Sequence, residues 1–410
     1  MTAQNLFYLF IAFMVIEFLI EKFLDWLNAK HFNDSLPAEL QDIFDAESYQ
    51  KSQAYKRDNY HFERLTGSLS FIFILLFLFL KGFAWLDKLV SNWTGNSLLQ
   101  SLYFFGILLL AGSLFSIPFA YYKTFVIEEK YGFNKSTKKL FFTDQLKSLL
   151  LSILLGGVLL AVFIWFYQSA GKYFWIYAWL FITAFTVFIN LFYTSLIVPL
   201  FNKLTPLEEG ELKEKLQNLA RKTNYNLDQI YVIDGSKRSS KANAYFSGFG
   251  PKKKVVLYDT LIADLSPDEI TAVLAHEIGH YKHKHIIFNL LLSILTTGLM
   301  LYLLSLVIDS DLLAKALGVN IPKFHIGLVA FALLFTPVSF IIGIVTNWLS
   351  RKFEYQADNF AKKHHNAIDL ISGLKKLSGK SFSNLTPHPW YIWVHYSHPS
   401  LLQRIGNLKK

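Results

Sequence analysis

The chain has 410 residues, of which 53% are hydrophobic and 17% are charged, and its mean hydropathy of +0.32 is too high for an ordinary soluble protein of this length. It contains no cysteine, so disulfides, thiolate metal ligands and a cysteine nucleophile are excluded, and any metal site must consist of histidines and carboxylates. The net charge of +10 is scattered between apolar stretches and forms no basic patch of the nucleic-acid-binding type, which favours contact with an anionic membrane leaflet instead.

The first predicted element is an apolar stretch from Asn5 to Ile20, in which Glu17 is the one charged residue. A signal peptide would need a basic segment before this stretch and a small-residue cleavage site after it, so we expect a retained helix that begins outside. Six further stretches, each about 19 residues or longer, could cross the roughly 30 Å of hydrocarbon in a bilayer. They cover residues 68–86, 98–121, 149–168, 173–201, 286–308 and 325–349. The sequence therefore predicts seven membrane-spanning helices.

The charges in the connections orient these helices. Alternate connections are rich in Lys and Arg, and the connections between them hold few. The rich segments are residues 22–67, 122–148, 202–285 and the tail after residue 350, and the poor ones contain, for example, Lys88, Lys172, Lys315 and Lys323. By the positive-inside rule, the N-terminus lies outside, and the rich connections and the C-terminus lie in the cytoplasm.

The connection between the fifth and sixth spans has the patterns of a small folded segment. Residues 206–222 have helical periodicity with acidic residues near the start, and residues 230–233 are typical of a short strand. Residues 244–250 and 254–258 predict a hairpin bent at Gly250-Pro251. The edge of such a sheet could hold an extended peptide by main-chain pairing, or the sheet could be a cap that only packs on a helix. Asn243, just before the hairpin, could bond a substrate backbone or simply occupy a turn.

The next helix carries a metal-binding pattern. Ser266, Pro267 and Glu269 form an N-terminal capping sequence, so a helix should begin there and run through the motif His276-Glu277-Ile278-Gly279-His280. Four residues advance about 6 Å and slightly more than one turn, so His276 and His280 share a helix face where one Zn²⁺ can meet both imidazoles. Glu277 can instead accept a proton from a water molecule that the metal activates. By chance, about 0.03 such motifs are expected from 12 His and 30 acidic residues in 410 positions.

A catalytic zinc needs a third protein ligand, which must lie downstream. Glu354 is the candidate, because it follows the last span at the membrane surface where His276 is also expected. Asp358, one helical turn further on, could bond the far nitrogen of a ligand histidine. Near the C-terminus, His398 or Arg404 could stabilise the oxyanion formed when an amide is attacked, although each is equally compatible with a turn or surface position.

With these residues in place, the sequence resembles the type I CAAX prenyl proteases, the seven-span zinc endopeptidases of the membrane. The likeness extends over most of the chain and includes two loop signatures, segments flanking the cytoplasmic region, and the tail. These are KSQAY (51–55), TFVIEEKYGFNK (124–135), PLFNK (199–203), DGSKRSS (234–240), NAYF (243–246) and HYSHP (395–399) with Arg404. Two positions depart from the family pattern: Lys241 stands where histidine is more common, and Gln403 stands where an acid is.

The resemblance implies a role for each candidate residue and one zinc ion per chain. It implies the metal ligands His276, His280 and Glu354, the base Glu277, the orienting residue Asp358, the substrate-backbone contacts Asn243 and Ala244, and His398 and Arg404 as supports of the transition state or substrate. It also implies an α-helical membrane protein with a water-filled chamber and a small cytoplasmic α+β, zincin-like domain.

The predicted organisation follows the spans. We expect transmembrane helices 1–5 with their loops in residues 1–201, a cytoplasmic metallopeptidase segment in 202–285, helices 6 and 7 in 286–349, and a cytoplasmic C-terminal segment with the third ligand in 350–410. The membrane would be a bacterial inner membrane or, in a eukaryote, that of the endoplasmic reticulum.

The predicted function is zinc-dependent endopeptidase activity that removes the C-terminal tripeptide of prenylated CAAX proteins or peptides. The expected partners are a peptide or lipidated-protein substrate and the bilayer, with no nucleic acid and no need for an oligomer. One alternative is a quality-control protease for misfolded or stalled membrane polypeptides. Another is a zinc-binding transporter, which the few ionisable residues in the spans disfavour.

Overall fold

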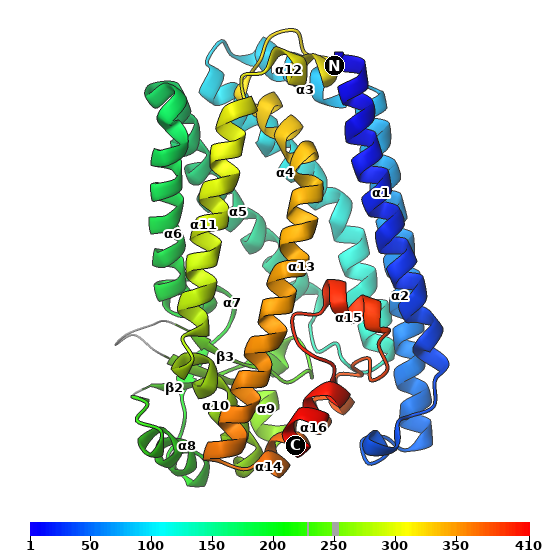
Figure 1. Ribbon diagram of the computed structural model, residues 1–410, viewed down its shortest axis with the longest axis vertical. Helices are drawn as coiled ribbons and strands as arrows, with labels where there is room; N and C mark the ends of the chain where they lie inside the picture. The colour runs from blue at the N-terminus through cyan, green and yellow to red at the C-terminus, as the bar shows by residue number, and fades with distance from the viewer. Residues whose placement is uncertain (228, 248–253) are drawn as a thin grey trace.

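The computed structural model describes residues 1–227, 229–247 and 254–410 of the chain. Long helices lie side by side along the longest axis, with the N-terminus at one end and the C-terminus at the other (Figure 1). The small sheet and the helices around it lie at the C-terminal end of the molecule, below the long helices in Figure 1.

Each predicted span overlaps one of the long helices. They are α1 (Ala3–Ala29), α2 (Ala46–Phe79), α4 (Ser97–Tyr122), α5 (Lys138–Ala170), α6 (Phe174–Leu196), α11 (His285–Val307) and α13 (Phe324–His364). By length and apolarity, five continuous helical segments of the described chain could cross a membrane: 46–79, 97–128, 138–201, 285–307 and 324–364. The segment 138–201 includes both α5 and α6, which the turn Gly171–Tyr173 joins. The first predicted span lies in α1, outside these five segments.

The span predicted over residues 68–86 ends earlier than expected. Helix α2 ends at Phe79, the chain turns at Lys81 with a positive φ of 53°, and Gly82 begins the separate helix α3 (Gly82–Trp93). The apolar pattern continues through this turn because Phe83, Leu86 and Val90 of α3 are buried in a protein core at that end of the molecule. That core also contains residues of α1, α4, α13 and the short helix α12 (Asp311–Ala316). Hydropathy therefore could not distinguish a lipid-facing helix from a buried cap.

Several helices are longer than the apolar stretches that predicted them. Helix α2 begins at Ala46 within the polar stretch, and α13 has 41 residues, so it extends about 62 Å against a hydrocarbon thickness of roughly 30 Å. Glu354 therefore lies on the same continuous helix as the last predicted span, rather than on a new one.

The sheet has four strands in the order β1-β2-β4-β3, where β1 is Leu204–Pro206, β2 Ile230–Ile233, β3 Ala244–Ser247 and β4 Lys254–Tyr258. The predicted strand over 230–233 and the antiparallel pairing of β3 with β4 are confirmed, whereas the turn at Gly250-Pro251 lies outside the described residues. The helix predicted from residue 206 begins later, as α8 (Glu211–Lys222), because Pro206 pairs with Tyr231 in the unexpected strand β1. Strand β3 occupies one edge of the sheet.

The helix with the HExxH motif, α10 (Pro267–Lys282), lies at the centre of this region. As predicted, Ser266 and Glu269 form a complete capping box at its start. One face packs in a core with α8, the sheet, and the helices α14 (Ala367–Lys380) and α16 (Leu401–Lys409). Buried members of this core include Leu216, Leu257, Ile270, Leu274 and Ile278. Among the described residues, the remaining α-helices are the short α7 (Val198–Phe201), α9 (Asp259–Asp264) and α15 (Pro389–His395).

Gly279 lets α10 approach α13 closely. A Cβ atom at this position would lie 2.9 Å from Ala357 Cα and 3.1 Å from the Ala357 carbonyl oxygen. Both are backbone atoms of α13, so no side-chain rotation could relieve the overlap and the two helices would have to separate.

We therefore expect Gly279→Ala to lower the free energy of unfolding by about 1–3 kcal/mol, as overpacking in a core does, and to weaken metal binding by moving the two histidines away from Glu354. Gly343→Ala is the matched control, since it lies on α13 and has nothing within 4 Å of the added methyl group. Denaturant unfolding in detergent and metal content would be measured for both variants. Equal behaviour of the two would contradict this role of Gly279.

Candidate metal centre

Two imidazole rings project from one face of α10 and meet a carboxylate from α13. His276 Nε2 lies 3.2 Å from His280 Nε2, and Glu354 Oε1 lies 3.2 Å from His280 Nε2. Glu354 Oε2 lies 3.5 Å from His276 Nε2. Among the described residues, these three side chains form a group whose ligand atoms lie within 4.8 Å of one another. The structure thus brings together the three predicted ligands, which are up to 78 positions apart in the chain.

The donor atoms suit a small divalent cation. Glu354 Oε2 is buried and accepts no hydrogen bond from the described residues. Two imidazole lone pairs and a carboxylate that face one another repel unless a cation or a proton lies between them. In a tetrahedral zinc site with bonds of about 2.0–2.1 Å, neighbouring ligand atoms lie about 3.3 Å apart, which matches the distances between these atoms. Nitrogen and carboxylate donors are a set that zinc accepts readily.

A buried ion pair holds the His276 ring from behind. Asp358 Oδ1 lies 2.8 Å from His276 Nδ1, and Arg404 makes two hydrogen bonds to the same carboxylate, at 2.9 and 2.5 Å. Asp358 is fully buried. Asp358 thus contacts the His276 ring, and the guanidinium of Arg404 is paired with that carboxylate and also lies 3.6 Å from Glu354 Oε2. This arrangement favours a positioning role for Arg404 over the predicted alternative of direct oxyanion stabilisation.

The same contacts change the protonation of His276. Burial lowers its pKa, but the neighbouring Asp358 and Glu354 carboxylates favour the charged imidazolium, outweigh burial and raise the pKa to about 9. A metal ion binds the neutral imidazole, so a proton competes with the metal at this ring.

Glu277 and His398 are two further candidate catalytic residues. Glu277 follows His276 on α10, and among the residues that the structure describes its carboxylate makes no hydrogen bond or ion pair. His398 lies 3.3 Å from Glu354 Oε1 through Nε2, yet its side chain is 61% exposed. A cavity of 430 Å³ adjoins His398 and is also lined by Tyr396 and Ser400. His398 therefore contacts both the candidate ligand Glu354 and this cavity.

Asn243 and Ala244 lie at the start of the edge strand β3. Asn243 Oδ1 accepts a hydrogen bond from the Ala244 N–H, and the Asn243 carbonyl accepts one from the Tyr258 N–H of β4. The backbone of Asn243 is thus used within the sheet, and the outer edge of β3 is the side that could pair with an extended peptide.

Two further features were not predicted from the sequence. His285, which the spacing suggested was structural or on the surface, is buried and lies 3.1 Å from His280 Nδ1 through its own Nδ1. Lys241 contacts Glu128 at 2.8 Å and the Tyr55 hydroxyl at 2.9 Å, so it joins both predicted loop signatures to the sheet region. A possible signal for His285 was its position five residues after His280, but that spacing alone does not indicate contact.

The departure at Gln403 also has a local explanation. Its side chain accepts a hydrogen bond from the Ser400 N–H, and Ser400 caps the N–H of Gln403, so the two form the capping box of α16. An amide fulfils this role as well as an acid does. The capping box fixes the start of the helix on which Arg404 lies.

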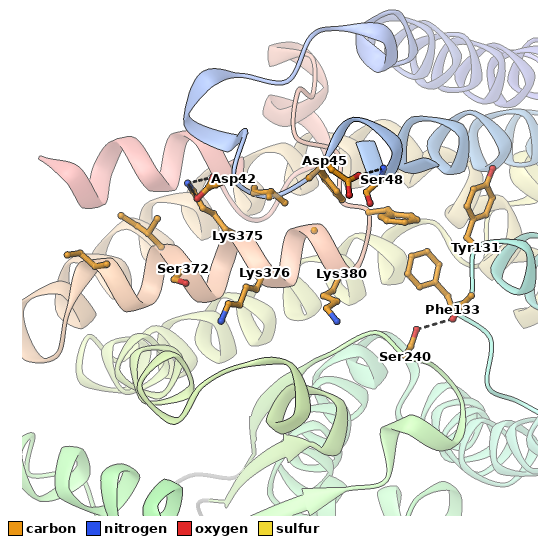
Figure 2. A pocket seen from close by; sticks show the side chains of 17 residues that line it. Asp42, Asp45, Ser48, Tyr131, Phe133, Ser240, Ser372, Lys375, Lys376 and Lys380 are labelled. Atoms are coloured by element: carbon orange, nitrogen blue, oxygen red, sulfur yellow. Dashed lines mark hydrogen bonds and ion pairs between the residues drawn. The ribbon is translucent and has the colours of Figure 1, made fainter. Parts of the chain in front are cut away.

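A larger cavity of 830 Å³ is lined by described residues other than the three candidate ligands. Figure 2 shows this cavity between α14 and the segments around Asp45 and Phe133. Its lysines are already paired: Lys375 with Asp42, Lys376 with Glu269 and Lys380 with Asp264. The ligand group His276, His280 and Glu354 is not among the described residues that line it.

Two family models match consecutive parts of the chain. Residues 25–203 match the model described as CAAX prenyl protease N-terminal, five membrane helices, and residues 206–410 match the model of peptidase family M48. The boundary between them falls within β1, so the second match contains the strands β2, β3 and β4, α10 and all three candidate ligands.

Curated relatives and a solved structure extend over nearly the whole chain. The chain is 36% identical to a CAAX prenyl protease 1 homolog of Oryza sativa, which covers 97% of the chain and 96% of the relative. It is 35% identical to CAAX prenyl protease 1 of Saccharomyces cerevisiae, over 97% and 94%. The crystal structure of Ste24p from S. mikatae superposes with a TM-score of 0.94 at 35% identity, covering 99% of each chain.

Proposed function

Because the chain belongs to peptidase family M48 and is a membrane metalloendopeptidase, we propose that it removes the C-terminal tripeptide of prenylated CAAX proteins. The relatives named CAAX prenyl protease 1 support this substrate class, since they match the chain nearly from end to end. The observation that carries the proposal is the convergence of His276, His280 and Glu354, whose ligand atoms lie within 4.8 Å of one another. Glu277 follows His276 on the same helix.

We propose that the three converging residues hold one Zn²⁺. When bound, this ion would supply a Lewis acid that makes a water molecule more acidic and polarises the scissile carbonyl. Glu277 would accept the proton of the attacking water and deliver it to the leaving amine. His398, exposed beside Glu354, would donate to the carbonyl oxygen as that oxygen gains charge. Asp358, with Arg404 behind it, would hold the His276 ring in one orientation and one tautomer.

The substrate would lie along the outer edge of β3. We propose that Asn243 and Ala244 bond its backbone in an extended conformation, which the position of β3 as the last strand of the sheet supports. A prenylated cysteine would then keep its lipid in the bilayer while the three terminal residues reach the metal centre.

We further propose the topology that the loop charges indicate. Seven helices would span the membrane, with the N-terminus outside and residues 202–285 and 350–410 in the cytoplasm. The placement of the sheet, α10 and the C-terminus at one end of the molecule supports this division (Figure 1). The membrane would be that of the endoplasmic reticulum in a eukaryote or the inner membrane in a bacterium.

Three substrates would test the function: a farnesylated C-a-a-X peptide, the same peptide without the lipid, and an unprenylated misfolded membrane polypeptide. Purified protein is incubated with each, with and without a chelator, and the products are identified by mass spectrometry. We expect chelator-sensitive release of the intact tripeptide from the farnesylated peptide. Cleavage of the misfolded polypeptide alone would instead indicate quality-control proteolysis.

A further inference from the structure

The second histidine of the motif has a neutral support of its own. His280 Nδ1 lies 3.1 Å from His285 Nδ1, and His285 Nε2 lies 2.7 Å from Gln356 Oε1. His285 is only 3% exposed, so water competes little for these hydrogen bonds. The His276 ring contacts the charged Asp358 carboxylate, whereas the His280 ring contacts a chain of two uncharged groups, His285 and Gln356.

The hydrogen-bond partners fix the direction of this chain. Because Gln356 Oε1 can only accept, His285 Nε2 carries the hydrogen, and His285 Nδ1 is then an acceptor in the neutral ring. His280 Nδ1 must donate to it. This tautomer leaves the lone pair of His280 on Nε2, the atom that faces Glu354 and His276. The hydrogen-bond chain thus selects the tautomer of His280 that a metal ligand needs.

Three local features hold His285 in place. Lys284, with a φ of 58°, turns the chain sharply after α10, so His285 becomes the first residue of α11. Its ring stacks on Phe353 of α13, with centroids 4.2 Å apart and planes 14° apart. Gln356 lies on the same helix, two residues after Glu354. One helix therefore supplies a ligand and also the group that orients another ligand.

We propose that His285 and Gln356 are positioning residues, which hold His280 in the metal-binding tautomer and orientation by a neutral hydrogen-bond chain. This inference rests on the proposed metal site and goes beyond it, because neither residue touches the metal or the substrate. It predicts that the charge of the residue at position 356 tunes the metal affinity. A negatively charged acceptor at this position would polarise the His285 and His280 rings and make His280 a stronger metal ligand. An apolar residue would remove the hydrogen bond that orients the two rings.

The test measures zinc affinity of full-length protein by competition with a chromophoric chelator, without any substrate. We expect His285→Ala and Gln356→Leu to weaken zinc binding about 10–100-fold, the usual effect of losing such a partner, and Gln356→Glu to strengthen it. The double variant of His285 and Gln356 should bind zinc about as weakly as His285→Ala alone, because the two residues act in series. The d–d absorption of bound Co²⁺ should change in the single variants.

His283→Ala is the matched control. His283 stacks on the same ring, with planes 15° apart, but it is exposed and bonds no ligand. It should keep the zinc affinity and Co²⁺ spectrum of the wild type. The proposal is overturned if Gln356→Leu and Gln356→Glu shift the affinity in the same direction, or if His283→Ala has the effect of His285→Ala. Wild-type protein that binds no stoichiometric zinc would instead refute the metal site itself.

Discussion

Glu277→Gln is expected to abolish peptide cleavage while the protein keeps its metal and its fold. Glutamine has the same shape as glutamate but cannot accept the proton of an attacking water. Proton transfer by a positioned side chain contributes about 10²–10⁴-fold to a rate, so the loss of kcat should fall in this range or above. Since each factor of ten corresponds to about 1.36 kcal/mol in the barrier, the expected rise is about 3–5 kcal/mol.

The measurement compares single-turnover rates and metal content of the variant and the wild type. Asp268→Asn is the control, because Asp268 is an acid on the same helix that pairs with Lys215 at the opposite end from the rings. It should retain activity. A Glu277→Gln enzyme with bound metal and full turnover would remove Glu277 from the mechanism, and one without metal would show that Glu277 has a structural role in the site.

Local signals explain what the sequence could predict. The capping box of Ser266 and Glu269 is encoded within four residues, and the alignment of His276 with His280 follows from helix geometry alone. The strand 230–233 is a short apolar run with β-branched residues, and it also needed no distant partner to be recognised. For the same reason, Glu354 and Asp358 could be recognised as a pair, one turn apart on a helix.

Tertiary contacts explain which features could not be predicted from the sequence. Nothing near Arg404 in the sequence indicates a bidentate bond to Asp358, which lies 46 positions away. The sequence predicts His285 as a structural or surface residue at the start of a span, and only the packing of α10 and α11 on α13 buries it against His280. The end of α2 at Phe79 depended on a core that α3 forms with α12 and α13. Hydropathy reports the apolar surface of a segment but not whether lipid or protein covers it.

The capacity of the site to hold metal depends most strongly on Glu354, because it is the one anionic donor of the group and it comes from a different helix. Glu354→Gln should reduce zinc affinity by more than about 100-fold, which exceeds the effect expected for the loss of a partner behind a ligand, and activity should fall with the metal content. The amide is isosteric, so the packing of α10 on α13 is kept. Arg404 stays paired with Asp358 in this variant, so no new unpaired charge is buried.

The experiment separates metal loss from misfolding by measuring unfolding in the presence of a chelator, where neither protein holds zinc. We expect the two apo proteins to unfold at similar denaturant concentrations, and only the wild type to be stabilised when zinc is added, because a ligand that binds the native state alone shifts the unfolding equilibrium. If the variant were stabilised by zinc as much as the wild type, Glu354 would not be a ligand. The convergence of its carboxylate with the two imidazoles would then require another explanation, and the case for hydrolysis at this point of the structure would fail with it.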